Sequence, residues 1–398
     1  MNNNPSPSEW NNTDIDTRWV KNAHQWELSR GMRKEAQSSS GVEEAEKKGK
    51  KPKVLLVHSP GMWNITDGDL KELRRNSELV HMIPKSMTQE KLASLCKGVD
   101  HLMLNIDCIE TTAEKMERID EKFYSNKNVQ QLKTMNVDMS DLDYFSPKVI
   151  EKHCKNLILQ SVPNDYGNCA VAENVAESAV SEIMLHAKNR HLAYVDVANG
   201  KPADCRPGML LKGNIAGVVG YGRIGTRVAK KLEALGMKVM VHDVKKINRD
   251  NSSLKEIFKK CKAISIHVPT VMPDGDSNVD LIDSDLLGLC EGTILINLAT
   301  DVIVNSKAVA RAIKDKKLIG YSCEPNYGSA KFAEKHYLPV LEKHPEFHLA
   351  PCSSGFGTEE VSIQMKTGWI SNTLSAIRGK PENVWNTEKQ TKPKEKGA

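Results

Sequence analysis

Three glycines have the type and spacing that bind the diphosphate of a dinucleotide. Gly220, Gly222 and Gly225 follow an apolar run and form the pattern Gly-x-Gly-x-x-Gly. In this pattern the first glycine permits a tight turn, the second lets the backbone approach a pyrophosphate, and the third lets the next helix pack closely on the strand. The N-terminus of that helix is expected to present backbone N–H groups to the phosphates, and Arg223 and Ile224 before it are expected to contact the cofactor.

An acidic residue completes the pattern. Asp243 stands 23 positions after Gly220 and follows a second apolar run. A carboxylate at this place accepts hydrogen bonds from the ribose hydroxyls of the adenosine and favours NAD over NADP. Lys245 and Lys246 lie close by and could pair with a 2′-phosphate. NADP therefore stays open as the less favoured cofactor.

The elements that must position these residues can be read from the apolar runs. The pattern predicts a strand over 214–219, a helix over 226–235 and a strand over 238–242. Further strands are expected at 263–267, 293–297, 318–322 and 347–350, with a helix over 306–314 between two of them. Five or six strands that alternate with helices form a doubly wound parallel sheet, the Rossmann arrangement of α/β proteins.

A second α/β unit precedes this one. Strands are expected at 53–58, 79–83, 101–105, 132–137 and 156–160, with a helix over 89–96. A long helix over 172–189 leads into the glycine pattern, and a last helix over 361–377 ends before Gly379 and Pro381. The first unit has no glycine-rich turn, so we do not expect it to bind a nucleotide.

Composition limits the other possibilities. Residues 1–52 and 387–398 are polar and charged, which predicts disordered tails. The net charge is only +5, and much of the surplus lies in lysine runs such as 47–51, which argues against a nucleic-acid-binding face. No apolar run is long enough for a membrane span, and the first residues lack a signal-peptide pattern. The nine cysteines form no Cys-x-x-Cys pair, which favours reduced thiols in the cytoplasm and predicts no metal site.

Several segments, in order along the chain, resemble the NAD-dependent D-2-hydroxyacid dehydrogenase family. Residues 294–299, Ile-Leu-Ile-Asn-Leu-Ala, resemble its "ILINTAR" segment, and residues 379–384 resemble its C-terminal "GKPxNxVN". The other similar segments are Val175-Ala-Glu177, the glycine pattern with the helix that follows it, and residues 265–269, 308–313 and 317–320.

The resemblance implies a particular organisation. Residues 53–171 plus 361–386 would form a discontinuous, flavodoxin-like substrate domain, and residues 172–360 would form the NAD-binding domain. Family members are usually homodimers through the cofactor domain. The resemblance also adds cofactor contacts: His267 and Pro269 in the strand beside the adenosine, Ala299 in the segment similar to "ILINTAR", and Glu324 where the family has an Asp that receives the nicotinamide carboxamide.

The catalytic positions of the family are occupied by other residues. Family enzymes bind the substrate carboxylate with an Arg and transfer the proton with a His that a Glu orients. The corresponding places hold Thr300, Ser329 and Cys352, although a shifted loop could substitute Glu334 for the Glu. The substrate loop also departs from the family pattern, at residues 105–108. A 2-oxo acid would therefore lack its charge-assisted clamp and its proton donor.

Two hypotheses for function follow. The first is an oxidoreductase with an altered active site and an altered substrate, in which Cys352, an inert thiol otherwise, takes part in proton transfer, with His348 nearby in sequence. The second is a catalytically silent NAD(H)-binding regulator or scaffold. In that case the N-terminal tail, with Trp10, Trp19 and Trp26, would bind a protein partner or have no role.

Overall fold

The structure is a computed structural model of the chain. Contacts between residues divide the chain into two units, Met1–Lys51 and Pro52–Ala398. The structure describes residues 50–59, 65–110, 119–138, 147–161, 170–200, 207–270, 272, 277–324, 347–349 and 357–384. The expected tails therefore lie almost wholly outside the described residues. So do Ser329, Glu334 and Cys352, and the side chain of His348 is not described either.

The first sheet is parallel and has five strands in the order β2-β1-β3-β4-β5. All five lie where the sequence predicted strands. Their bounds are Lys53–Val57 (β1), Glu78–Met82 (β2), His101–Leu104 (β3), Thr134–Val137 (β4) and Ile158–Gln160 (β5). The chain changes direction across this sheet between β1 and β3, because β2 lies on one side of β1 and the later strands lie on the other.

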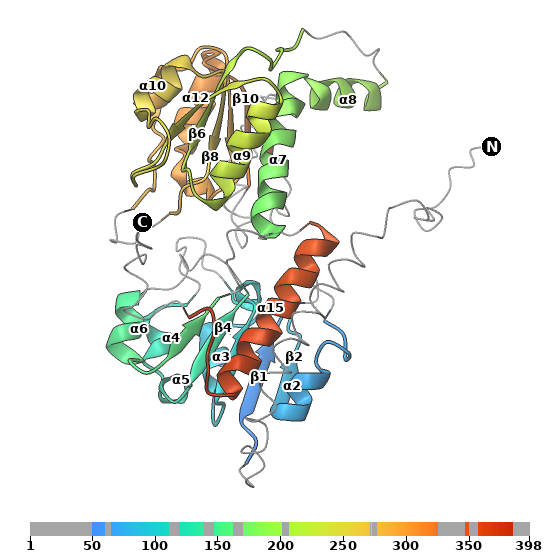
Figure 1. Cartoon of the computed structure of the whole chain (residues 1–398), viewed down its shortest axis with the longest axis vertical. Coiled ribbons are helices and arrows are strands. Elements are labelled where there is room, and N and C mark those ends of the chain that lie inside the picture. The colour runs from blue at the N-terminus through green and yellow to red at the C-terminus, as the bar shows by residue number, and fades with distance from the viewer. Residues whose placement is uncertain are drawn as a thin grey trace, which may run out of the picture. The chain divides into compact units, whose positions relative to one another are not determined.

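Helices cover both faces of the first sheet (Figure 1). One face packs against α3 (Gln89–Leu95), α4 (Glu121–Tyr124), α5 (Lys127–Gln130) and α6 (Pro147–His153). The other packs against α2 (Lys71–Asn76) and the C-terminal helix α15 (Glu359–Ile377). Burial of both faces explains why strands such as β1 and β3 are apolar without alternation.

The second sheet is also parallel, with six strands in the order β11-β10-β9-β8-β6-β7. The prediction of a complete doubly wound sheet is confirmed. Its strands are β6 (Ile215–Val219), β7 (Lys238–His242), β8 (Ala263–Ile266), β9 (Thr293–Asn297), β10 (Leu318–Cys323) and β11 (Phe347–Leu349). Here the chain changes direction between β6 and β8, which is where an open α/β sheet binds its ligand.

Two helical layers flank the second sheet. The helices α7 (Ala170–Ala187) and α9 (Arg223–Ala234) pack on one face, and α8 (Arg190–Ala198) follows α7. The opposite face packs against α10 (Leu254–Lys260), α11 (Ser284–Gly288) and α12 (Ser306–Lys314). Sequence patterns did not predict α2, α4, α5, α6, α8, α10 or α11, because most are too short for a helical period to stand out.

Candidate cofactor site

The glycine-rich turn connects β6 to α9 and has the backbone geometry that the sequence predicted. Gly220 has φ +90°, a conformation that L side chains rarely adopt, and a Cβ there would collide with the carbonyl oxygen of His267. A Cβ at Gly225 would collide with the carbonyl oxygen of Gly220, so the helix can approach the strand only because residue 225 is glycine. At Gly222 a Cβ would meet no atom within 4 Å. The space beside Gly222 is therefore open for a ligand.

The start of α9 offers hydrogen-bond donors beside that open space. Gly222 is the N-cap of α9, and no side chain caps this end. Arg223 is the first helical residue, and its Nη1 atom is buried without a hydrogen-bond partner. Ile224 is half-buried and packs toward the core between the sheet and α7. Uncapped N–H groups and a buried guanidinium donor without a partner fit a bound diphosphate.

Asp243 is held next to the glycine-rich turn. Its Oδ2 accepts a hydrogen bond from the N–H of Tyr221 at 2.7 Å, and its Oδ1 accepts one from the N–H of Lys245 at 2.8 Å. Each carboxylate oxygen can accept more than one hydrogen bond, so the group can still receive ribose hydroxyls. Lys245 and Lys246 are exposed. The carboxylate that the sequence predicted as the ribose acceptor is thus fixed in place by the turn itself.

His267 and Pro269 follow β8 at the same edge of the sheet. The Nε2 atom of His267 lies 2.7 Å from the Oγ of Ser265, and burial lowers the pKa of this imidazole to about 3. The ring is therefore neutral near pH 7. Pro269 is exposed, and its carbonyl oxygen accepts a hydrogen bond from the side chain of Asn278. Both residues lie beside the turn, because the carbonyl of His267 touches Gly220.

The ends of β9 and β10 bring the remaining predicted residues to this edge. The Oγ1 of Thr300 accepts a hydrogen bond from the Oγ1 of Thr270 at 2.7 Å. Asn297 makes hydrogen bonds to both segments at this edge. Its side-chain oxygen accepts a hydrogen bond from the N–H of Ala299, and its carbonyl oxygen accepts one from the N–H of Glu324. The buried Asp301 then begins the short 3-10 helix η3 (Asp301–Ile303). Thr300 offers a hydroxyl where the resemblance would place a guanidinium.

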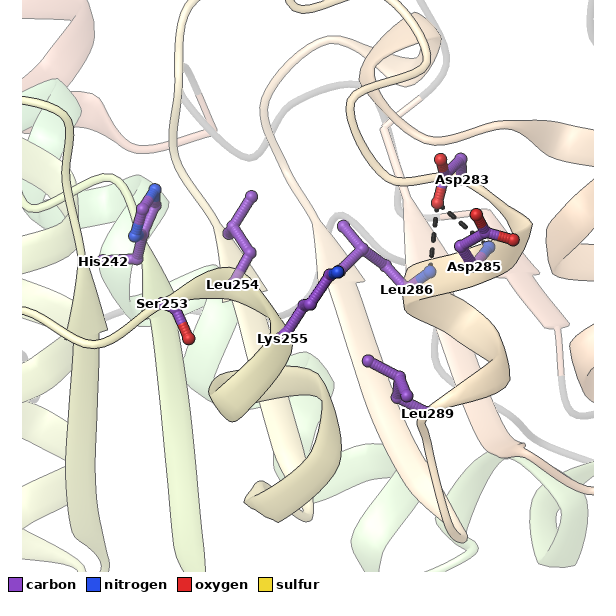
Figure 2. A pocket seen from close by; sticks show the side chains of 8 residues that line it. All are labelled: His242, Ser253, Leu254, Lys255, Asp283, Asp285, Leu286 and Leu289. Carbon is purple, nitrogen blue, oxygen red and sulfur yellow. Dashed lines mark hydrogen bonds between the residues drawn. The ribbon is translucent and has the colours of Figure 1, made fainter.

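A cavity of about 650 Å³ lies near Asp243 and was not predicted from the sequence (Figure 2). His242 at the end of β7 lines one side, and leucines of α10 and α11 face the space from the other elements. Its lining residues are His242, Ser253, Leu254, Lys255, Asp283, Asp285, Leu286 and Leu289. The leucines belong to two separate helical segments, so no local sequence pattern could predict the cavity. Its three leucines give the space an apolar side, which suits a flat ring.

Charged pairs connect the helices that carry the site. Glu173 on α7 accepts a hydrogen bond from Nε of Arg227 on α9 at 2.9 Å, and it also pairs with Lys231. Arg227 donates in turn to the carbonyl oxygen of Arg223 at 2.8 Å. These bonds hold the first turn of α9 against α7. They fix the direction in which the uncapped N–H groups point.

Other kinds of site find little support in the residues that the structure describes. Within these ranges no cluster of three or more His, Cys, Asp or Glu side chains could hold a metal ion, and no helix is long and apolar enough to cross a membrane. The six described cysteines are buried, and burial raises the pKa of Cys96 and Cys261 to about 12. Such thiols are poor nucleophiles at neutral pH.

Comparison with known proteins relates the NAD-binding segment to one protein family. Residues 180–325 match the family described as "D-isomer specific 2-hydroxyacid dehydrogenase, NAD binding domain". The chain is 33% identical over 222 residues to D-3-phosphoglycerate dehydrogenase of Haemophilus influenzae, a match that spans 51% of this chain and about half (52%) of that protein. It is 23% identical over 318 residues to D-lactate dehydrogenase of Lactobacillus delbrueckii subsp. bulgaricus, which spans 76% of this chain and 89% of that one.

A solved structure extends the likeness to both sheets. The structure of a glyoxylate reductase from Paecilomyes thermophila superposes with a TM-score of 0.70 over 85% of this chain and 99% of that one, at 18% identity. This likeness shows the two-domain fold. Together with the matched NAD-binding segment and the sequence relatives, it shows that the chain is distantly homologous to the D-isomer specific 2-hydroxyacid dehydrogenase family.

Proposed function

We propose that the protein is an NAD(H)-dependent oxidoreductase of this family that acts on a CH–OH or carbonyl group with an altered active site. The observation that carries the proposal is the glycine-rich turn at Gly220–Gly225 together with the Asp243 carboxylate held against it. The family relatives named above are dehydrogenases, which supports an oxidoreductase role.

Each described residue has a part in this proposal. The N–H groups at the start of α9 and the guanidinium of Arg223 hold the diphosphate, Asp243 accepts the ribose hydroxyls, and the cavity beside His242 receives the adenine. Ala299 and Glu324 lie at the edge that the nicotinamide half reaches. When bound, the nicotinamide supplies or accepts the hydride. The neutral ring of His267 adds no positive charge near the adenosine.

Binding of the cofactor is tested by Gly222→Val. A Cβ at residue 222 meets no protein atom within 4 Å, so we expect valine to leave the fold intact while its side chain excludes the diphosphate. Calorimetric titration with NADH should show loss of binding, and circular dichroism should be unchanged. Gly68→Val is a matched control, because a Cβ there makes only an ordinary contact, 3.5 Å from the Oγ1 of Thr66, in the loop before α2 and outside the cofactor domain. Unchanged NADH affinity in Gly222→Val would refute the cofactor site.

We expect ordinary 2-oxo acids to be poor substrates. Thr300 cannot form the two parallel charge-assisted bonds of an arginine, and general acid–base help alone contributes roughly 10²–10⁴ in rate. The rates of NADH oxidation with glyoxylate, pyruvate and hydroxypyruvate should therefore be low, and Thr300→Arg together with Cys352→His should raise them in part. Rapid reduction of these acids by the unmodified protein would contradict the proposed change of active site.

A catalytically silent NAD(H)-binding protein is the alternative, and the same assay separates the two. Hydride transfer to any of a panel of aldehydes, ketones and oxo acids supports the enzyme. Tight NADH binding with no change in nicotinamide absorbance across the panel supports the silent regulator or scaffold.

We also propose that two copies of the chain associate through the cofactor domain. Met184 on α7 and Tyr194 and Val197 on α8 expose apolar side chains, and the exposed fraction of Tyr194 is 76%. Figure 1 shows these two helices joined at one end. Light scattering should give the mass of a dimer for the unmodified protein and of a monomer for Tyr194→Glu. A monomeric unmodified protein would refute this association.

A further inference from the structure

Three polar side chains stand in one row across the carboxyl end of the first sheet. His58, Asn105 and Asp138 directly follow β1, β3 and β4. The parallel register of these strands places the three residues on the same face of the sheet. All are buried, with exposed fractions of 5%, 3% and 1%. Polar groups so deeply buried need partners or a function.

This row, called the polar row below, spans the place where the chain changes direction across the sheet. The strand order β2-β1-β3-β4-β5 puts that place between β1 and β3, and therefore between His58 and Asn105. Open α/β sheets bind their ligands outside the carboxyl ends of the strands at such a point. The second sheet follows the same rule at its glycine-rich turn.

Hydrogen bonds within the chain already occupy the polar row and the N–H groups beside it. The Oδ1 of Asn105 accepts a hydrogen bond from the N–H of Ser59 at 3.2 Å, and its amide donates to Asp138. The N–H of Ile106 donates to the Oδ1 of Asp138 at 3.4 Å. N–H groups of this kind can bind an anion, but here the Asn105 amide and the N–H of Ile106 already donate to the carboxylate of Asp138, and the N–H of Ser59 donates to Asn105.

His58 adds a second acceptor to the row. Its Nδ1 lies 2.9 Å from the carbonyl oxygen of Ser59, and a carbonyl can only accept, so Nδ1 carries a proton. In the tautomer with that single proton the Nε2 atom is an acceptor, and it is buried without a hydrogen-bond partner. The ring stacks on that of His81, with centroids 4.9 Å apart. Packing thus fixes its orientation.

We propose that the polar row selects the substrate: it favours an uncharged carbonyl or alcohol compound that carries N–H or O–H donors, and it disfavours the anion of a 2-oxo or 2-hydroxy acid. The proposal rests on the oxidoreductase function proposed above. The Nε2 atom of His58 is the acceptor that a ligand amide or hydroxyl satisfies, whereas a ligand carboxylate meets the like charge of Asp138 and finds the amide of Asn105 already bonded to that carboxylate.

A matched pair of ligands tests the selection. D-lactamide and D-lactate have the same shape and differ in an amide against a carboxylate. Calorimetric titration of the full-length protein saturated with NAD⁺ should show lactamide binding at least about tenfold more tightly, the ratio that about 1.4 kcal/mol produces. Equal or tighter binding of lactate, or no binding of lactamide, would overturn the proposal.

Two variants test whether the polar row causes the preference for lactamide over lactate. Asp138→Asn keeps the shape and removes the charge, so the affinity for lactate should rise toward that for lactamide. Asp100→Asn is the control, because it makes the same change of charge at the opposite end of this sheet, where Asp100 pairs with Lys133 at 2.9 Å. An unchanged ratio in Asp138→Asn, or an equal shift in Asp100→Asn, would contradict the assignment.

His58→Phe gives a second test in case Asp138→Asn fails to fold. Phenylalanine can still stack on His81 but has no Nε2 acceptor, so lactamide affinity should fall while NAD⁺ affinity stays the same. Unchanged lactamide affinity would count against the row. Titration with NAD⁺ alone comes first in each case. A protein that does not bind NAD⁺ refutes the proposed function, whereas normal NAD⁺ binding with lactate preferred refutes only the substrate selection.

Discussion

Asp243 is the residue on which the choice between NAD and NADP depends. Its carboxylate is fixed by the N–H groups of Tyr221 and Lys245, so it cannot easily turn away from a 2′-phosphate. The nearby guanidinium of Arg249 is already engaged, because it donates to Glu233 at 3.0 Å and to the carbonyl oxygen of Val239 at 3.0 Å. The exposed lysines at 245 and 246 are the cations next to Asp243 in sequence that could attract the phosphate.

We therefore expect NADH to bind more tightly than NADPH, and Asp243→Ala to narrow or reverse the difference. Removing a fixed like charge should change the ratio of the two dissociation constants by at least about tenfold. Fluorescence titration with each cofactor measures the ratio. Asp250→Ala is the control, since Asp250 is an exposed carboxylate in the same segment. Tighter NADPH binding by the unmodified protein would show that the lysines dominate.

The C-terminal helix α15 is joined to the first sheet by buried hydrogen bonds as well as by apolar packing. The amide of Asn136 on β4 donates to the carbonyl oxygen of Trp369 at 2.6 Å and to the hydroxyl of Thr373 at 2.8 Å. The indole of Trp369 donates back to the carbonyl oxygen of Asn136 at 2.9 Å. These bonds join elements more than 200 residues apart in the chain, and both Asn136 and Trp369 are fully buried.

Asn136→Ala should destabilise the protein by about 3 kcal/mol, because the two hydrogen bonds that its amide donates and the one that it accepts from Asn372 are all buried, and each contributes about 1 kcal/mol. Urea unfolding followed by tryptophan fluorescence measures the change. Asn76→Ala removes an exposed side-chain bond to the carbonyl oxygen of Glu72 and should cost less than about 0.5 kcal/mol. Equal midpoints for the two variants would show that packing alone holds α15.

Buried histidines should make the stability of the whole molecule depend on pH. Burial lowers the pKa of His101 to about 4 and that of His267 to about 3. In the unfolded chain both imidazoles have pKa values near 6.5. Below pH 6.5 the unfolded state binds more protons than the folded state, so stability is present above about pH 6.5 and is lost as the pH falls toward 4 and 3.

The loss from His101 alone should reach roughly 3 kcal/mol near pH 4, at 1.36 kcal/mol per unit of pKa shift. Thermal unfolding at a series of pH values should show the midpoint falling below about pH 6.5. His101→Gln keeps a polar side chain near Thr134, whose Oγ1 lies 2.9 Å from the ring, and should flatten that fall. A midpoint that rises on acidification, or an unchanged slope in His101→Gln, would contradict this account.

The sequence by itself determined the parts of the molecule that depend on local chemistry. The strands at 53–57, 215–219 and 293–297 could be predicted because both faces of each sheet are covered, which leaves continuous apolar runs. Gly220 and Gly225 could be given roles because their requirement for glycine follows from turn geometry. Helix α9 begins at Arg223 rather than at the predicted Thr226, because its first turn contains Gly225, a residue that is unfavourable inside a helix.

Only the tertiary structure decided what lies around these elements. The cavity beside His242 exists because α10 and α11 pack on the same face of the sheet, which no local pattern states. The polar row joins His58, Asn105 and Asp138 because parallel pairing aligns strands that are separated by about 30 to 50 residues. Residue type and spacing predict a turn or a strand. The hydrogen bonds between distant residues depend on strand register and helix packing, which are established only in the folded protein.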